Sequence, residues 1–165
     1  MPLATRLILL VLACAALVVV TGCGDDSEEP ASTSTPEAAA TPERTKPEIT
    51  VPKGKAPKKL VIEDIEEGAG TPAKSGDQVT VQYVGISFLN GRQFDASWDR
   101  GEPFQFQLGA GSVIPGWDQG VEGMKVGGRR QLVIPPDLAY GPEGSPPTIG
   151  PNETLVFVID LLSVG

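Results

Sequence analysis

The stretch VIPGWDQGV, residues 113–121, predicts a short helix that begins at Pro115 and runs to about Glu122. Proline is well placed in a first helical turn, where its missing N–H is not needed. Trp117 and Val121 are four residues apart and therefore share one face of the helix. Because a helix of about two turns is not stable by itself, this face must pack against another part of the chain.

The segments on both sides of this helix alternate apolar and polar residues, as half-buried strands do. In QVTVQYVGIS, residues 78–87, Val79, Val81 and Tyr83 fall on one face. The pair Asn90–Gly91 between apolar residues indicates a two-residue hairpin turn. Further strand-like runs begin at Lys58 and occupy residues 103–109, 129–135 and 154–162. The sequence therefore predicts an α+β fold, in which about five antiparallel strands form a sheet that curls over one short helix.

The composition excludes several kinds of catalytic site. The chain has 165 residues and no histidine, which removes Ser-His-Asp and Cys-His catalysis and most zinc sites. Its two cysteines, Cys14 and Cys23, both precede the strand-like segments. The net charge of -8 argues against nucleic-acid binding as the main role. We expect no metal and no cofactor, so any catalysis must use carboxylates, tyrosines, backbone groups or shape.

The N-terminus, residues 1–22, has the features of an export signal. Arg6 precedes an apolar run from Leu7 to Val20. As a helix this run would span about 21 Å, which is short of the ~30 Å hydrocarbon core and typical of a signal peptide. The run ends in VTGC, which resembles the lipobox of bacterial lipoproteins and predicts a lipid on Cys23. The alternatives are an ordinary signal peptide or an uncleaved anchor.

Residues 23–57 predict a disordered tether. Proline, serine, threonine, alanine and charged residues dominate this segment, without an apolar period. Such a composition buries too little surface to offset the chain entropy lost on folding. As a flexible coil the segment would span on the order of 30–35 Å. We therefore expect an extracytoplasmic domain, residues 58–165, that is tethered to the bacterial cell membrane by a lipid.

Several motifs follow one another in a fixed order within the predicted domain. They read VTVQYVG, NGRQFDASWDRGEPFQFQLG, SVIPGWDQGVEGMKVGGRRQLVIPPDLAYG and TLVFVIDLL. Together they resemble the FKBP-type peptidyl-prolyl cis-trans isomerases over about residues 58–165. The resemblance implies a five-stranded antiparallel sheet half-wrapped around one short α-helix. It also implies an apolar cleft that binds proline-containing polypeptides, and inhibition by macrolides such as rapamycin.

The resemblance also implies the residues of the site. Those implied in catalysis are Asp95, Tyr140, Ile114 and Phe94, with the Ile114 backbone N–H and the Tyr140 hydroxyl donating to substrate carbonyls. Those implied in substrate binding are Tyr83, Phe104, Phe106, Val113, Trp117, Phe157, Arg100 and Ile149. Trp117 would form the pocket floor, and Asp95 would orient Tyr83 and Arg100, since a buried carboxylate needs partners. Taken singly, the strand aromatics would be interpreted as core and Asp95 as a solvated carboxylate.

Two hypotheses about function remain open from the sequence. The first is an active, monomeric prolyl isomerase that acts on proteins folding outside the cytoplasmic membrane. The second is a module that binds proline-containing segments, or a chaperone, with incidental isomerase activity. The loop of residues 141–153 differs from the best-known members of the resembled family, with Ser145 where some have a histidine and Thr148 in place of a branched apolar residue.

Overall fold

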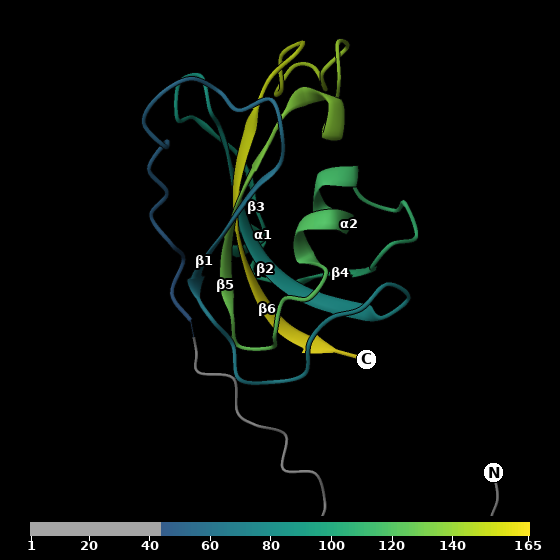
Figure 1. The fold of residues 1–165 in the computed structure, drawn as a ribbon. Helices are drawn as coiled ribbons and strands as arrows, with labels where there is room; N and C mark the ends of the chain where they lie inside the picture. The colour runs from purple at the N-terminus through teal and green to yellow at the C-terminus, as the bar shows by residue number, and fades with distance from the viewer. Residues whose placement is uncertain (1–43) are drawn as a thin grey trace, which may run out of the picture. The chain divides into compact units, whose positions relative to one another are not determined.

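The computed structural model describes residues 44–165, which form one antiparallel sheet with short helices (Figure 1). The predicted signal peptide, Cys23 and the tether as far as residue 43 lie outside the described residues. The strands are β1 (Val61–Glu66), β2 (Gln78–Ser87), β3 (Gln93–Ala96), β4 (Phe104–Gln107), β5 (Arg129–Ile134) and β6 (Leu155–Val164). The helices are α1 (Ser97–Arg100), α2 (Pro115–Val121) and a 3₁₀ turn, η1 (Pro136–Leu138). Within residues 44–165, no helix is long and apolar enough to cross a membrane.

The sheet has six strands in the order β1-β5-β6-β2-β3, with β4 also paired to β2. The number differs from the five predicted, because β3 and β4 lie one after the other along the same side of β2. β4 pairs with the first part of β2, where Val79 faces Phe106, and β3 pairs with its last part, where Gly85 faces Asp95. The predicted α+β class is confirmed, with one principal short helix.

Strand β2 has two buried faces beyond its first residues. Val79, Val81 and Tyr83 belong to the main core cluster, which α2 covers, as their alternation predicts. Val84 and Ile86 belong to a second cluster on the opposite, outer face of the sheet. A sheet with apolar residues on both faces needs cover on both.

Helix α2 lies across the inner face of the sheet (Figure 1). Trp117 is 4% exposed and Val121 is fully buried, so the predicted helical face is the packed one. Gly116 and Gly120 let the helix approach β5 closely: a Cβ added at Gly120 would lie 2.5 Å from Cδ1 of Leu132. The helix therefore lies directly against the sheet and holds Trp117 between them.

The hairpin between β2 and β3 has a longer loop than the sequence predicts. The Ser87 N–H donates to the carbonyl of Arg92, and the Gly91 N–H donates to the carbonyl of Ser87. A two-residue type I′ turn would need positive φ at both Asn90 and Gly91. Gly91 has a φ of 71°, but among the described residues Asn152 is the only non-glycine with positive φ.

Residues 44–57, which the sequence analysis places in the tether, have no helix or strand. Two of their side chains, Ile49 and Val51, nevertheless pack against the cluster on the outer face of the sheet. The compact part of the described chain thus begins upstream of residue 58. The polar composition of the segment gave no signal of packing. Ile49 and Val51 are nevertheless two positions apart and therefore share one side of an extended chain.

Candidate active site

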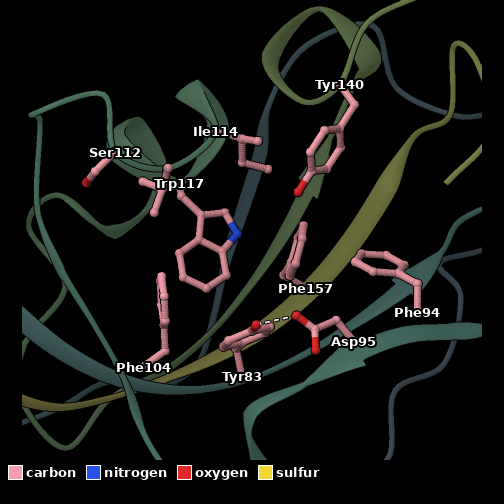
Figure 2. Close-up of a pocket in the computed structure, with 10 residues that line it drawn as sticks. Tyr83, Phe94, Asp95, Phe104, Ser112, Ile114, Trp117, Tyr140 and Phe157 are labelled. Atoms are coloured by element: carbon pink, nitrogen blue, oxygen red, sulfur yellow. Dashed lines mark hydrogen bonds between the residues drawn. The ribbon is translucent and has the colours of Figure 1, made fainter. Parts of the chain in front are cut away.

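A cavity of about 200 Å³ opens between α2 and the inner face of the sheet (Figure 2). Its walls come from β2, β3, β4, the start of α2, the segment after η1, and β6. The lining residues are Tyr83, Phe94, Asp95, Phe104, Ser112, Val113, Ile114, Trp117, Tyr140 and Phe157. Pockets for drug-sized ligands measure ~300–1,000 Å³, so this cavity suits a smaller group such as one ring of a larger ligand.

Trp117 forms the floor of this cavity. The ring of Tyr83 stands nearly perpendicular to the indole, with centroids 5.0 Å apart and an interplanar angle of 83°. Phe157 meets the indole in the same way from another side, at 5.3 Å and 88°. Edge-to-face contacts of this kind stabilise aromatic clusters beyond their buried area. The indole is therefore held in one orientation by its aromatic neighbours.

Gly85 makes room for two of the aromatic walls. A Cβ at this position in β2 would lie 2.6 Å from Cζ of Phe94 and 2.8 Å from Cε1 of Phe157. The rings of Phe94 and Phe157 pack at 5.4 Å and 84° across the space that glycine leaves. The sequence signal for this feature is a glycine inside a strand, which often marks a close approach.

Three polar side chains form a network at the rim of the cavity. The hydroxyl of Tyr83 donates to the carboxylate of Asp95, and Nη1 of Arg100 also donates to that carboxylate. Nη2 of Arg100 donates to the Tyr83 hydroxyl oxygen over 2.9 Å. The guanidinium lies 5.5 Å from the centroid of the Tyr83 ring, which adds a cation–π contact. Asp95 thus accepts hydrogen bonds from both Tyr83 and Arg100, although its own side chain is 43% exposed rather than buried.

Burial and the contact with Asp95 keep Tyr83 protonated. Burial, followed by the hydrogen bond to Asp95, raises the pKa of Tyr83 to about 12, although Arg100 acts in the opposite direction. The contact with Tyr83 also raises the pKa of Arg100. The backbone of Tyr83 is fixed as well, since its N–H donates over 2.8 Å to Oγ of the buried Ser97.

Three hydrogen-bond donors at the cavity have no acceptor among residues 44–165. The Ile114 N–H precedes the first helical residue, and no described backbone or side-chain group accepts from it. The Tyr140 hydroxyl points into the cavity, and burial raises the pKa of Tyr140 (Figure 2). Nε1 of Trp117 is buried without a partner. A ligand with carbonyl groups would satisfy the first two of these donors.

The structure brings most of the predicted site residues together, but not all. Nine of the twelve line the cavity, whereas Phe106, Ile149 and Arg100 do not. Phe106 is 4% exposed and stacks behind Phe104, with ring centroids 5.7 Å apart. Ile149 is 5% exposed and belongs to the main core cluster. Arg100 reaches the rim only through Asp95 and Tyr83. Ser112 lines the cavity and had no signal in the sequence beyond its place beside Val113.

The lining of the cavity combines aromatic rings with a few polar groups. Its lining offers aromatic surfaces, one carboxylate that is already paired, and unpaired donors. In the described part of the chain, no group of three metal-ligating side chains is assembled. An apolar floor with donors at its edge can desolvate and orient a ring and its flanking carbonyl groups.

Comparisons with known proteins agree on one family. A sequence model of the FKBP-type peptidyl-prolyl cis-trans isomerases matches residues 69–162. The chain is 59% identical over 120 residues to "FK506-binding protein" of Streptomyces anulatus, a match that covers 72% of this chain and 97% of that protein. It is 55% identical over 118 residues to "Probable FK506-binding protein" of Corynebacterium glutamicum, covering 72% and 98%. Matches of this extent must begin upstream of β1.

A solved structure supports the same assignment. The crystal structure of AtFKBP13 superposes with a TM-score of 0.61 at 39% sequence identity, covering 67% of this chain and 96% of that one. The fold, the ordered motifs and the sequence matches therefore coincide over the region that builds the cavity. The chain belongs to the FKBP-type peptidyl-prolyl cis-trans isomerase family, and it is an enzyme of that type.

Proposed function

We propose that the protein isomerises X-Pro bonds of polypeptides in the cavity above Trp117, and that it does so outside the cytoplasmic membrane. The observation that carries the proposal about the site is the pairing of an aromatic floor with unpaired donors, the Ile114 N–H and the Tyr140 hydroxyl. A pyrrolidine ring would stack on the indole. The carbonyl groups beside the proline would then accept hydrogen bonds from the two donors.

The reaction needs no nucleophile. Rotation about an X-Pro bond has a barrier of about 18–20 kcal/mol, which amide resonance sets. Without a catalyst it takes tens to hundreds of seconds. An apolar cavity removes the water that stabilises the planar, charge-separated amide, and fixed donors can favour the twisted form. Each tenfold gain in rate needs only about 1.4 kcal/mol of such differential stabilisation.

Asp95 acts in this scheme through its partners. Its carboxylate accepts hydrogen bonds from Tyr83 and Arg100 and holds the tyrosine ring edge-on to the indole of Trp117. Phe94, Phe104, Val113 and Phe157 form the apolar walls around the rotating bond. The ring of a macrolide such as rapamycin would occupy the same space, and the protein should bind it.

The test is exchange NMR on a peptide of the Ala-Leu-Pro-Phe type, with and without rapamycin, using the intact chain in detergent. Accelerated cis-trans exchange that the macrolide blocks would support catalysis in this cavity. Macrolide binding without accelerated exchange would overturn it in favour of a module that recognises proline-containing segments. A Trp117→Ala variant that still accelerates exchange as well as the parent would place the reaction elsewhere.

The location outside the membrane rests on residues 1–23. The apolar run that ends in VTGC supports lipidation of Cys23, and the tether would then carry the domain away from the bilayer. Cells grown with a labelled fatty acid should yield labelled, membrane-bound protein, and Cys23→Ala should abolish the label. Label that persists in this variant, or protein that is found in the cytosol, would contradict the anchor.

A further inference from the structure

The segment before the first strand covers the outer face of the sheet. We call residues 44–57 the N-terminal strap. It runs along the side of the sheet that faces away from α2 (Figure 1). Ile49 and Val51 are half-buried there and pack against the outer cluster. The members of that cluster are Val84, Ile86, Ala96, Val133 and Val156.

Charged contacts fix the beginning of the strap. Arg44 donates to the carbonyl oxygen of Gly127 and forms ion pairs with Glu66 at 3.0 Å and Asp160 at 3.4 Å. Arg129 holds the same Asp160 through two hydrogen bonds of 2.6 and 2.7 Å, and it donates over 3.0 Å to the carbonyl oxygen of Thr45. Asp160 is 1% exposed, and a buried carboxylate that loses its partners is strongly unfavourable.

The strap also contacts the segment of β3 and α1. Nζ of Lys46 lies 2.5 Å from Oδ1 of Asp99 in α1, and Nε2 of Gln93 donates over 2.7 Å to the other oxygen of Asp99. These hydrogen bonds lower the pKa of Asp99. Trp98 of α1 packs against the same outer cluster as Ile49 and Val51. The strap therefore supports residues 93–99 from outside.

The other side of the same segment belongs to the rim of the cavity. Asp95 lines the cavity, whereas the next residue of β3, Ala96, belongs to the cluster on the outer face of the sheet. In α1, Asp99 pairs with Lys46. The next residue, Arg100, donates hydrogen bonds to Asp95 and to the Tyr83 hydroxyl. A displacement of this short segment would move the strap contacts and the rim network together.

We propose that Ile49 and Val51, with Lys46 in a lesser part, are positioning residues for the isomerase reaction. They hold β3 and α1 in the position in which Asp95 and Arg100 fix the side chain of Tyr83 through hydrogen bonds. The proposal rests on the proposed role of the rim network in catalysis. The Lys46–Asp99 pair is exposed, and exposed pairs contribute little. The apolar contacts of Ile49 and Val51 carry most of the effect.

The test compares the intact chain in detergent with the Ile49→Ala, Val51→Ala double variant. Lys53→Ala is the matched control, because Lys53 is an exposed residue of the same strap. We expect kcat to fall by about tenfold, since small displacements of a catalytic constellation are costly, while KM stays within about twofold. Ile49→Val, which keeps a branched apolar side chain, should retain most of the activity. Equal kcat in the double variant and in the control would overturn the proposal.

A double-mutant cycle separates positioning from general stability. In an Asp95→Ala background, the strap substitutions should cause little further loss of kcat, because the network that they support is already broken. If the fold-losses in kcat from the strap substitutions and from Asp95→Ala multiply in full, the strap has a purely structural role.

A second readout does not depend on turnover. Relaxation of the Arg100 side-chain ¹⁵Nε should show an ordered guanidinium in the parent and in Lys53→Ala, and a mobile one in the double variant. An unchanged signal would overturn the proposal even if the parent did not isomerise peptides. Absence of exchange in the parent would count against the proposed function alone.

Discussion

Tyr83 joins the rim of the cavity to its floor, because its hydroxyl donates to Asp95 while its ring stands edge-on to Trp117. The ring centroids of Tyr83 and Trp117 are 5.0 Å apart. One side chain thus transmits the position of a polar network to the aromatic surface on which a proline ring would rest. This connection can be tested by substitutions of Asp95, Trp117 and Gly85, and by an alkaline titration of the tyrosines.

Replacing Asp95 with Asn should impair catalysis more than folding. The Asp95 and Arg100 side chains are each 43% exposed, so the loss of their ion pair should cost no more than about 1 kcal/mol of stability. The orientation of Tyr83 depends on the charge, and we expect the exchange rate to fall by about tenfold. Peptide exchange NMR and urea unfolding would measure the two effects, with the exposed Glu122→Gln as a control. A domain that unfolds while its folded fraction remains fully active would refute the assigned role.

Replacing Trp117 with Ala should remove the floor and weaken the core at once. Truncation of a buried aromatic residue typically costs about 3–5 kcal/mol of unfolding free energy, and macrolide affinity should drop with it. Trp117→Phe should cost much less, because Nε1 of Trp117 has no partner to lose. Denaturant unfolding and macrolide titration of both variants provide the comparison. Similar losses for Phe and Ala would mean that the indole N–H has an essential partner.

Replacing Gly85 with Ala should disrupt the wall of the cavity that Phe94 and Phe157 form. The added Cβ would collide with Phe94 and Phe157, which lie at 2.6 and 2.8 Å from its position. Overpacking of this kind costs about 1–3 kcal/mol and displaces the rings that form the wall. We expect isomerase activity to fall more steeply than stability. Gly150→Ala is the control, since its Cβ would meet only the end of the flexible Glu153 side chain at 3.3 Å. Full activity of Gly85→Ala would show that the wall is adaptable.

The alkaline titration of the folded protein should differ from that of the unfolded chain. The sequence has two tyrosines, and the pKa of each is raised in the fold, that of Tyr83 to about 12. An unfolded chain releases both protons near pH 10. Between about pH 10 and 12 the folded state therefore holds more protons, so the stability that these groups contribute is present below pH 10 and lost as pH rises.

Tyrosinate absorbance, measured with and without denaturant, would show the two titrations. Tyr83→Phe should remove the step near pH 12 in the folded protein. Activity should stay constant across the neutral range, because the raised pKa of each tyrosine keeps both groups protonated there. A loss of activity centred near pH 8 would require a titrating group that this site does not contain.

Much of the fold could be predicted because local pattern and burial agree. The alternation of residues 78–87 gave β2 with its correct faces, and Pro115 marked the start of α2. The helix α1 was missed, since four residues carry no period. The hairpin loop was predicted too short, because Asn90–Gly91 fits a two-residue turn but the backbone at Asn90 does not adopt positive φ.

The sequence by itself determined the fold class, because strand and helix periodicity places side chains on one face whatever their partners are. Its ordered motifs also resembled one family, and that resemblance, rather than periodicity, implied most of the residues that line the cavity. Only the tertiary structure decided which aromatic residues line the cavity and which support it from behind, as Phe104 and Phe106 show. It alone also joined Lys46, Ile49 and Val51 to the outer face of the sheet. Contacts between residues so far apart in the sequence depend on how the sheet folds back on itself, and no local pattern records that.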